Sequence, residues 1–168
     1  MREQLKEYLI WTAILVGITA LQIIFGNLIS INGVEPDFLL IAVVFLALRF
    51  GQVPAMSYGF AFGLLLDLYQ GELIGISSLA LTVAAFSIGY AHDPERADMR
   101  VRSYGVIPLV GAGAIIRNTV SIFAYFQSLN FDILSVLGRQ VLLGAVYTTV
   151  ISMIPVLVLV RTGNRLKV

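Results

Sequence analysis

Residues 59–79 read GFAFGLLLDLYQGELIGISSL, and this stretch decides the fold class of the chain. It is apolar almost throughout, and its glycines stand four or eight residues apart, at 59, 63, 71 and 75; four-residue spacing is typical of helices that pack closely in a membrane. It also carries one aspartate, Asp67, on the same four-residue spacing. A carboxylate in such a stretch needs a partner, because an isolated charge in hydrocarbon is costly.

The whole chain has the composition of an integral membrane protein. Of its 168 residues, 58% are hydrophobic and 12% are charged, whereas roughly a quarter of the residues of a soluble domain are charged. Cysteine is absent and His92 is the single histidine, which excludes disulfides, thiolate metal sites and histidine clusters. We expect one transmembrane domain, residues 1–168.

Six apolar segments are candidates for transmembrane helices, which need about 20 apolar residues each. The expected segments are about 8–29, 37–50, 53–70, 73–91, 104–127 and 134–160. The second is short, so it crosses with little tilt or with local thinning of the bilayer. A re-entrant pair formed by the second and third segments is the alternative.

The distribution of charge orients these segments. With both termini in the cytoplasm, nine of the eleven basic residues fall on cytoplasmic segments and the outer loops carry none. The positive-inside rule requires this arrangement. The sequence therefore predicts an all-α, polytopic protein, a compact bundle of six transmembrane helices with both termini in the cytoplasm.

Three charges remain inside the predicted bundle: Asp67, Arg117 and Arg139. The estimated depth of Arg139 matches that of Asp67, and Arg117 reaches the same level by extending its side chain. We expect Asp67 to pair with one or both arginines, with Asn118 as a further partner. This network is a structural latch, a site for a ligand or partner group, or a contact of snorkelling side chains with membrane lipid.

Small residues recur at four-residue spacing on two of the predicted helices and in the turn that follows one of them. Such spacing lets helix backbones approach closely in membranes. Packing within the chain is the expected use, and a docking face for another membrane protein or for a second copy of the chain is the alternative. The residues are Gly59, Gly63, Gly71, Gly75, Ala13 and Gly17.

Motifs of catalysis are missing. The sequence contains no phosphate-binding loop of the GxxxxGK[ST] type, no HExxH zinc pair and no GxSxG nucleophile elbow. His92, Asp93 and Glu95 look like a ligand set, but Pro94 and mixed charges around them favour a solvated cytoplasmic turn. We expect no enzyme activity, no cofactor, no metal and no nucleic-acid partner.

Two stretches, PDFLLIAVVFLALRFG (36–51) and the stretch 59–79, resemble the family of the bacterial rod shape-determining protein MreD. The resemblance lies in a Pro-Asp start to an apolar second helix, an Arg-x-Gly break, and a glycine-spaced third helix ending in Leu-Leu-x-Asp. The matching residues outside the third helix are Pro36, Asp37, Arg49 and Gly51.

The resemblance implies a non-enzymatic scaffold, in the bacterial inner membrane, of the machinery that elongates the cell wall and sets rod shape. The implied partners are the membrane-anchored protein MreC, the MreB filament, and the wall synthase RodA with its transpeptidase. The family is similar in fold to the S components of energy-coupling-factor vitamin transporters.

An S component is the alternative function. Asp67, Arg117 and Arg139 would then lie near a vitamin pocket, and Ala13 and Gly17 would dock on the coupling subunit. Long outer loops serve as lids in such subunits, and the predicted outer loops here are only a few residues each. The short loops favour the MreD interpretation.

Overall fold

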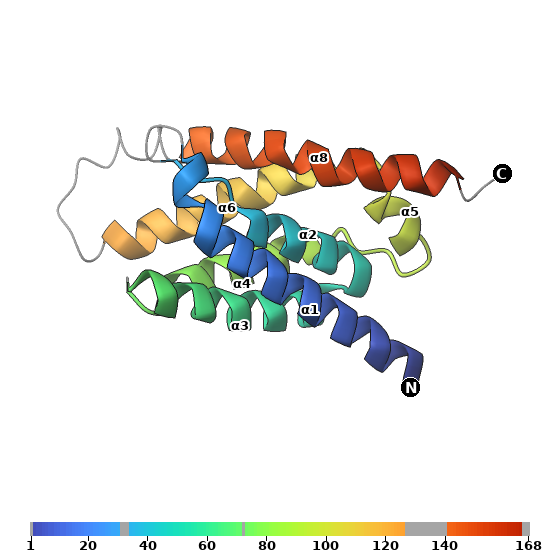
Figure 1. The fold of residues 1–168 in the computed structure, drawn as a ribbon, viewed down its shortest axis with the longest axis horizontal. Helices are drawn as coiled ribbons and strands as arrows, with labels where there is room; N and C mark the ends of the chain where they lie inside the picture. Colours follow the sequence, from blue (N-terminus) through green and yellow to red (C-terminus); the bar gives the residue numbers. More distant parts are fainter. Residues whose placement is uncertain (1, 31–33, 72, 127–140, 166–168) are drawn as a thin grey trace.

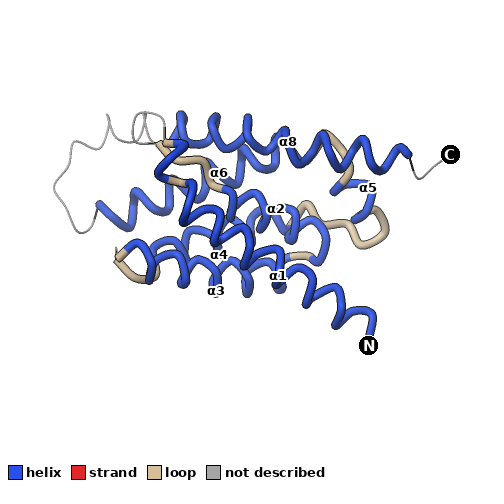
Figure 2. Tube along the Cα trace, viewed as in Figure 1, coloured by secondary structure: helices blue, strands red, loops and turns tan. Residues whose placement is uncertain are grey.

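The computed structural model describes residues 2–30, 34–71, 73–126 and 141–165, and within these ranges it contains helices and loops without a strand (Figures 1 and 2). Each predicted apolar segment corresponds to a helix, although residues 134–140 of the sixth segment lie outside the described residues. The prediction of an all-helical protein is confirmed. The elements are α1 (Arg2–Phe25), the 3-10 turn η1 (Asn27–Ile29), α2 (Phe38–Phe50), α3 (Gln52–Gln70), α4 (Ile76–Gly89), α5 (Ala97–Val101), α6 (Val106–Phe126) and α8 (Leu143–Arg165).

Three of the described helices are long and apolar enough to cross a bilayer. These candidate spans are Lys6–Phe25 in α1, Val106–Ala124 in α6 and Leu143–Arg161 in α8, whereas α2 and α4 are apolar but shorter. The long helices expose large apolar side chains such as Leu9 and Phe123, as expected of surface that faces lipid. The chain is therefore an integral membrane protein, and crossing by six segments stays a prediction.

Helix α2 lies inside the bundle rather than on its surface. Every residue from Leu39 to Leu48 is buried, and α2 contacts α1, α3, α4, α5, α6 and α8. A helix that is buried on all sides is apolar on all sides. Its 13 residues span about 20 Å, but its neighbours rather than lipid surround it. Its shortness therefore does not require the bilayer to thin around it.

Two glycines bring α3 into close contact with α4. A Cβ atom on Gly63 would lie 2.7 Å from the Cα of Ser78, and one on Gly59 would lie 3.3 Å from the carbonyl oxygen of Leu81. Glycine permits this approach of two backbones, as small residues commonly do between membrane helices. Gly59 and Gly63 therefore serve packing within the chain.

The two ends of the bundle differ in charge. The first turns of α1, the end of α2, helix α5 and the last turns of α8 lie at one end, which we call the basic end (Figure 1). The opposite end contains the turn between α3 and α4 and the starts of α2 and α4. Its buried acids are Asp37 and Asp67. Basic residues in or next to the elements of the basic end are Arg2, Lys6, Arg49, Arg96, Arg100, Arg102, Arg161 and Arg165.

Candidate functional site

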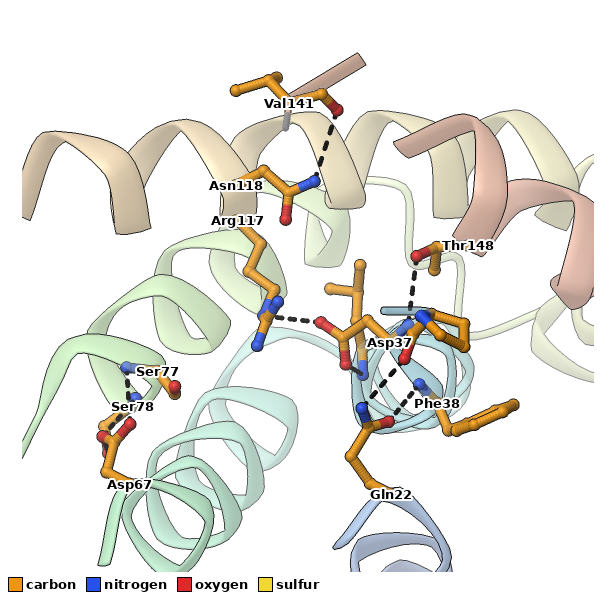
Figure 3. A network of polar contacts seen from close by, with 12 residues as sticks. Gln22, Asp37, Phe38, Asp67, Ser77, Ser78, Arg117, Asn118, Val141 and Thr148 are labelled. Atoms are coloured by element: carbon orange, nitrogen blue, oxygen red, sulfur yellow. Dashed lines mark hydrogen bonds and ion pairs between the residues drawn. The ribbon is translucent and has the colours of Figure 1, made fainter. Parts of the chain in front are cut away.

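Two buried aspartates lie at the starts of α2 and α4 and make separate sets of contacts (Figure 3). Asp37 is 5% exposed and Asp67 is 1% exposed. The first backbone N–H groups of a helix have no partner within the helix, and the bilayer core offers no water to them. A carboxylate at this position accepts their hydrogen bonds and is stabilised by the helix dipole.

Asp67 belongs to α3 and caps α4. Its Oδ2 accepts hydrogen bonds from the backbone N of Gly75 at 2.9 Å and of Ser78 at 3.3 Å. Its Oδ1 accepts one from the backbone N of Ser77 at 3.1 Å, and the hydroxyl of Ser78 donates to Oδ2 at 3.5 Å. The start of the following helix thus explains the carboxylate in the apolar stretch.

The turn between α3 and α4 depends on two glycines in left-handed conformations. Gly71 has a φ of 67° and Gly75 has a φ of 104°, values that glycine adopts without strain. A Cβ atom on either would meet nothing within 4 Å. Neither glycine therefore packs closely against the described residues, and a partner interface at them stays a prediction. In the structure they let the chain reverse so that the start of α4 returns to Asp67.

Asp37 precedes α2 and links it to two other helices. Its Oδ1 accepts a hydrogen bond from the backbone N of Leu40 at 2.8 Å, which is a helix N-cap contact. Its Oδ2 lies 2.6 Å from the Nε of Arg117 in α6, and because neither buried atom makes an aligned hydrogen bond, the contact is an ion pair. The backbone N of Asp37 donates to the Oγ1 of Thr148 in α8 at 3.2 Å.

Gln22 of α1 completes the contacts at the start of α2. Its Nε2 donates to the carbonyl oxygen of Pro36 at 2.9 Å, and its Oε1 accepts from the backbone N of Phe38 at 2.8 Å. Four helices therefore meet here: α1, α2, α6 and α8. Neither Gln22 nor Thr148 is among the residues that the sequence predicts for the site, although a lone amide in the apolar run of α1 indicates a buried polar partner.

The partners predicted for the buried charges need correction. The sequence predicts that Asp67 pairs with Arg139, Arg117 or both. Arg117 pairs with Asp37, and Asp67 contacts the start of α4, so Arg117 is not the partner of Asp67. Depth along a helix does not fix the direction in which a side chain points, and the guanidinium of Arg117 points toward Asp37 (Figure 3). The expected pair with Arg139 lies outside the described residues.

Asn118 links α6 to the chain near the start of α8 rather than to an aspartate. Its Nδ2 donates to the carbonyl oxygen of Val141 at 3.4 Å. A Cβ atom on Gly144 would lie 2.8 Å from that nitrogen. Asn118 thus belongs to the packing of α6 on α8.

The sequence matches the model of a known protein family, and the match covers nearly the whole chain. The family model described as rod shape-determining protein MreD matches residues 2–162. The chain belongs to this family. The match includes both aspartate sites and extends through most of α8. No curated protein and no solved structure matches the chain.

In this MreD-family chain, four residues that carry the resemblance lie at the two ends of α2. Pro36 and Asp37 lie at its start, and Arg49 and Gly51 lie at its end. Gly51 has φ 86° and ψ −171°, a combination essentially confined to glycine. This glycine permits the sharp break between α2 and α3.

His92 closes the end of α2. Its Nδ1 lies 2.8 Å from the carbonyl oxygen of Leu48, one of the carbonyls that a helix end leaves without a partner. The ring also lies 3.2 Å from the position of a Cβ atom on Gly51. His92 therefore supports the fold, and within the described residues no group of His, Cys, Asp and Glu could hold a metal ion.

Ala13 and Gly17 lie on the exposed side of α1. A Cβ atom on Gly17 would meet nothing within 4 Å. Neither residue serves packing against the described helices, so this face of α1 is open to lipid or to another protein.

Proposed function

We propose that this chain is a non-enzymatic scaffold of the complex that elongates the bacterial cell wall. It lies in the inner membrane, with six crossings and both termini in the cytoplasm. The family match over residues 2–162 is the observation that carries the proposal. Nine of the eleven basic residues lie on the segments assigned to the cytoplasm. This distribution supports the orientation.

The use of polar groups in the interior supports a structural role. A ligand site needs polar groups that converge on a pocket. Here Asp37, Asp67 and Gln22 are engaged at helix starts. A bundle braced in this way can position other membrane proteins without chemistry of its own.

The proposed partner is MreC, a membrane-anchored protein of the same machinery. Through MreC, the scaffold would connect the MreB filament in the cytoplasm to RodA and its transpeptidase. Membership in a family that determines rod shape supports this place in the complex.

Purification of the tagged full-length chain from its own bacterium in mild detergent tests the proposal. We expect MreC to be recovered with the chain and not with an unrelated tagged polytopic protein at equal expression. Recovery of a transporter coupling subunit and a bound vitamin, without MreC, would contradict the scaffold and favour the S-component alternative.

The exposed face of α1 is the proposed contact for a partner helix, because Gly17 has open space above it. Ala13 in this face and Ala112 in α6 are both exposed alanines, so Ala13→Leu and Ala112→Leu form a matched pair. We expect Ala13→Leu to lower the recovery of MreC and Ala112→Leu to leave it unchanged. Equal recovery with both variants would exclude this face, and loss of self-association alone would make a second copy of the chain its occupant.

A further inference from the structure

A cavity of about 290 Å³ lies at the basic end of the bundle. It is formed by the first turns of α1, the last turn of α2, and α5 with the segment before it. The contacts described at the two buried aspartates involve none of its lining residues, so it is a separate site. The lining residues are Glu7, Tyr8, Arg49, Phe50, Pro94, Ala97 and Asp98.

The charges that line this cavity do not balance. The Nη2 of Arg49 lies 3.3 Å from the Oε1 of Glu7, and its Nη1 contacts the Oδ1 of Asp98. Two carboxylates thus share one guanidinium, so among the lining residues the acids outnumber the bases by one. The side chains of Glu7 and Asp98 are 48% and 73% exposed, so a second cation can approach both from outside.

Tyr8 and Phe50 give the cavity an aromatic wall. Their rings stack with centroids 5.1 Å apart, and the guanidinium carbon of Arg49 lies 6.0 Å from the centroid of the Phe50 ring. Aromatic faces attract ammonium and guanidinium groups. The wall and the carboxylates therefore favour the same class of occupant, an organic cation.

We propose that the cavity receives a lysine or arginine side chain from the segment that flanks a partner's membrane helix. This inference rests on the proposed function and its orientation. The cytoplasmic flank of a membrane helix is rich in Lys and Arg, and the basic end of this bundle lies at that level. One such side chain would neutralise the lining, whereas a zwitterionic lipid headgroup would bring a phosphate beside two carboxylates.

Two double variants of the full chain test this inference with equal changes in net charge. Glu7→Gln with Asp98→Asn removes the acids of the cavity. Asp93→Asn with Glu95→Gln removes one aspartate and one glutamate from the neighbouring loop, outside the lining. In binding to purified full-length MreC in nanodiscs, we expect the cavity variant to be roughly fivefold to tenfold weaker and the loop variant to match the unaltered chain.

Each outcome separates this inference from the function on which it rests. Equal affinity of the two double variants would overturn the cavity site and leave the scaffold function standing. Failure of the unaltered chain to bind MreC would overturn both.

Reversing the charges on both proteins gives a second test, in which the expected result is restored binding rather than weakened binding. We expect Asp98→Lys to weaken binding, and replacement of the Lys or Arg residues flanking the MreC membrane helix by Glu to restore it. Restoration supports direct contact. If no such replacement restores binding to Asp98→Lys, the partner side chain does not occupy the cavity.

Discussion

The starts of α2 and α4 are both capped by a buried aspartate, but the two carboxylates have different partners. Asp37 is bound by one backbone N–H and by the guanidinium of Arg117, whereas Asp67 is bound by three backbone N–H groups and the hydroxyl of Ser78. The first site joins helices far apart in the sequence, and the second joins consecutive helices. Asp37 therefore joins α2 to α6 and α8, and Asp67 fixes the hairpin of α3 and α4.

The largest effect is expected from Asp37→Asn. The amide can still cap α2, but Arg117, whose side chain is 19% exposed, loses its counter-charge. Removing one partner of a buried ion pair is strongly destabilising, and we expect a loss of about 3 kcal/mol in the free energy of unfolding. Titration with SDS in mixed micelles measures this loss in the free energy of unfolding. A loss below about 0.5 kcal/mol, which is the size expected of a surface substitution, would contradict the ion pair.

Asp67→Asn is expected to have the second largest effect. The amide keeps one acceptor but turns an NH₂ group toward backbone donors, which leaves at least one N–H of α4 unsatisfied at a cost of about 2 kcal/mol. Asp93→Asn is the matched control, because Asp93 accepts a hydrogen bond from the backbone N of Glu95 in an exposed turn. Equal losses in the same unfolding titration would mean that Asp67 is not a buried cap.

The hairpin that Asp67 caps also depends on Gly63. Gly63→Ala places a methyl group 2.7 Å from the Cα of Ser78, and we expect it to cost about 1–2 kcal/mol in spite of the better helix propensity of alanine. Gly17→Ala has open space, so propensity alone should stabilise the chain slightly. Unfolding titrations that rank the two variants the other way round would place Gly63 outside the α3–α4 contact.

The smallest effect is expected at the exposed ion pair of the basic end. Glu7→Gln removes one carboxylate from Arg49 while Asp98 remains in contact. Because exposed pairs contribute about 0–1 kcal/mol, we expect a change of less than about 1 kcal/mol that shrinks further in high salt. A loss in the free energy of unfolding as large as that of Asp37→Asn would show that the ion pair of the basic end stabilises the fold as strongly as the buried one.

Much of the fold could be predicted from the sequence, because hydrophobic segments and glycine breaks are local signals. The ends of α2 at Phe38 and Phe50 lie within one residue of the predicted segment 37–50. The burial of α2 on all sides could not be predicted, because a run of apolar residues reads alike whether lipid or protein surrounds it.

The residues of the site were easier to predict than their partners. Asp67 and Arg117 are rare charges in apolar segments, and this alone indicates that they are buried and paired. Their partners depend on which side chains converge in space. Asp37 was assigned to a helix start without a counter-charge, and the donors to Asp67 lie beyond a turn that only the left-handed glycines make possible.

Double-mutant cycles with Arg117→Gln test the separation of the two aspartate sites most directly. The cycle isolates the interaction of two residues from their single effects. In unfolding titrations, we expect Arg117 to couple to Asp37 by about 2 kcal/mol and to Asp67 by less than about 0.5 kcal/mol. Strong coupling of Arg117 to Asp67, with none to Asp37, would contradict this arrangement and restore one of the two pairings that the sequence suggests for Asp67.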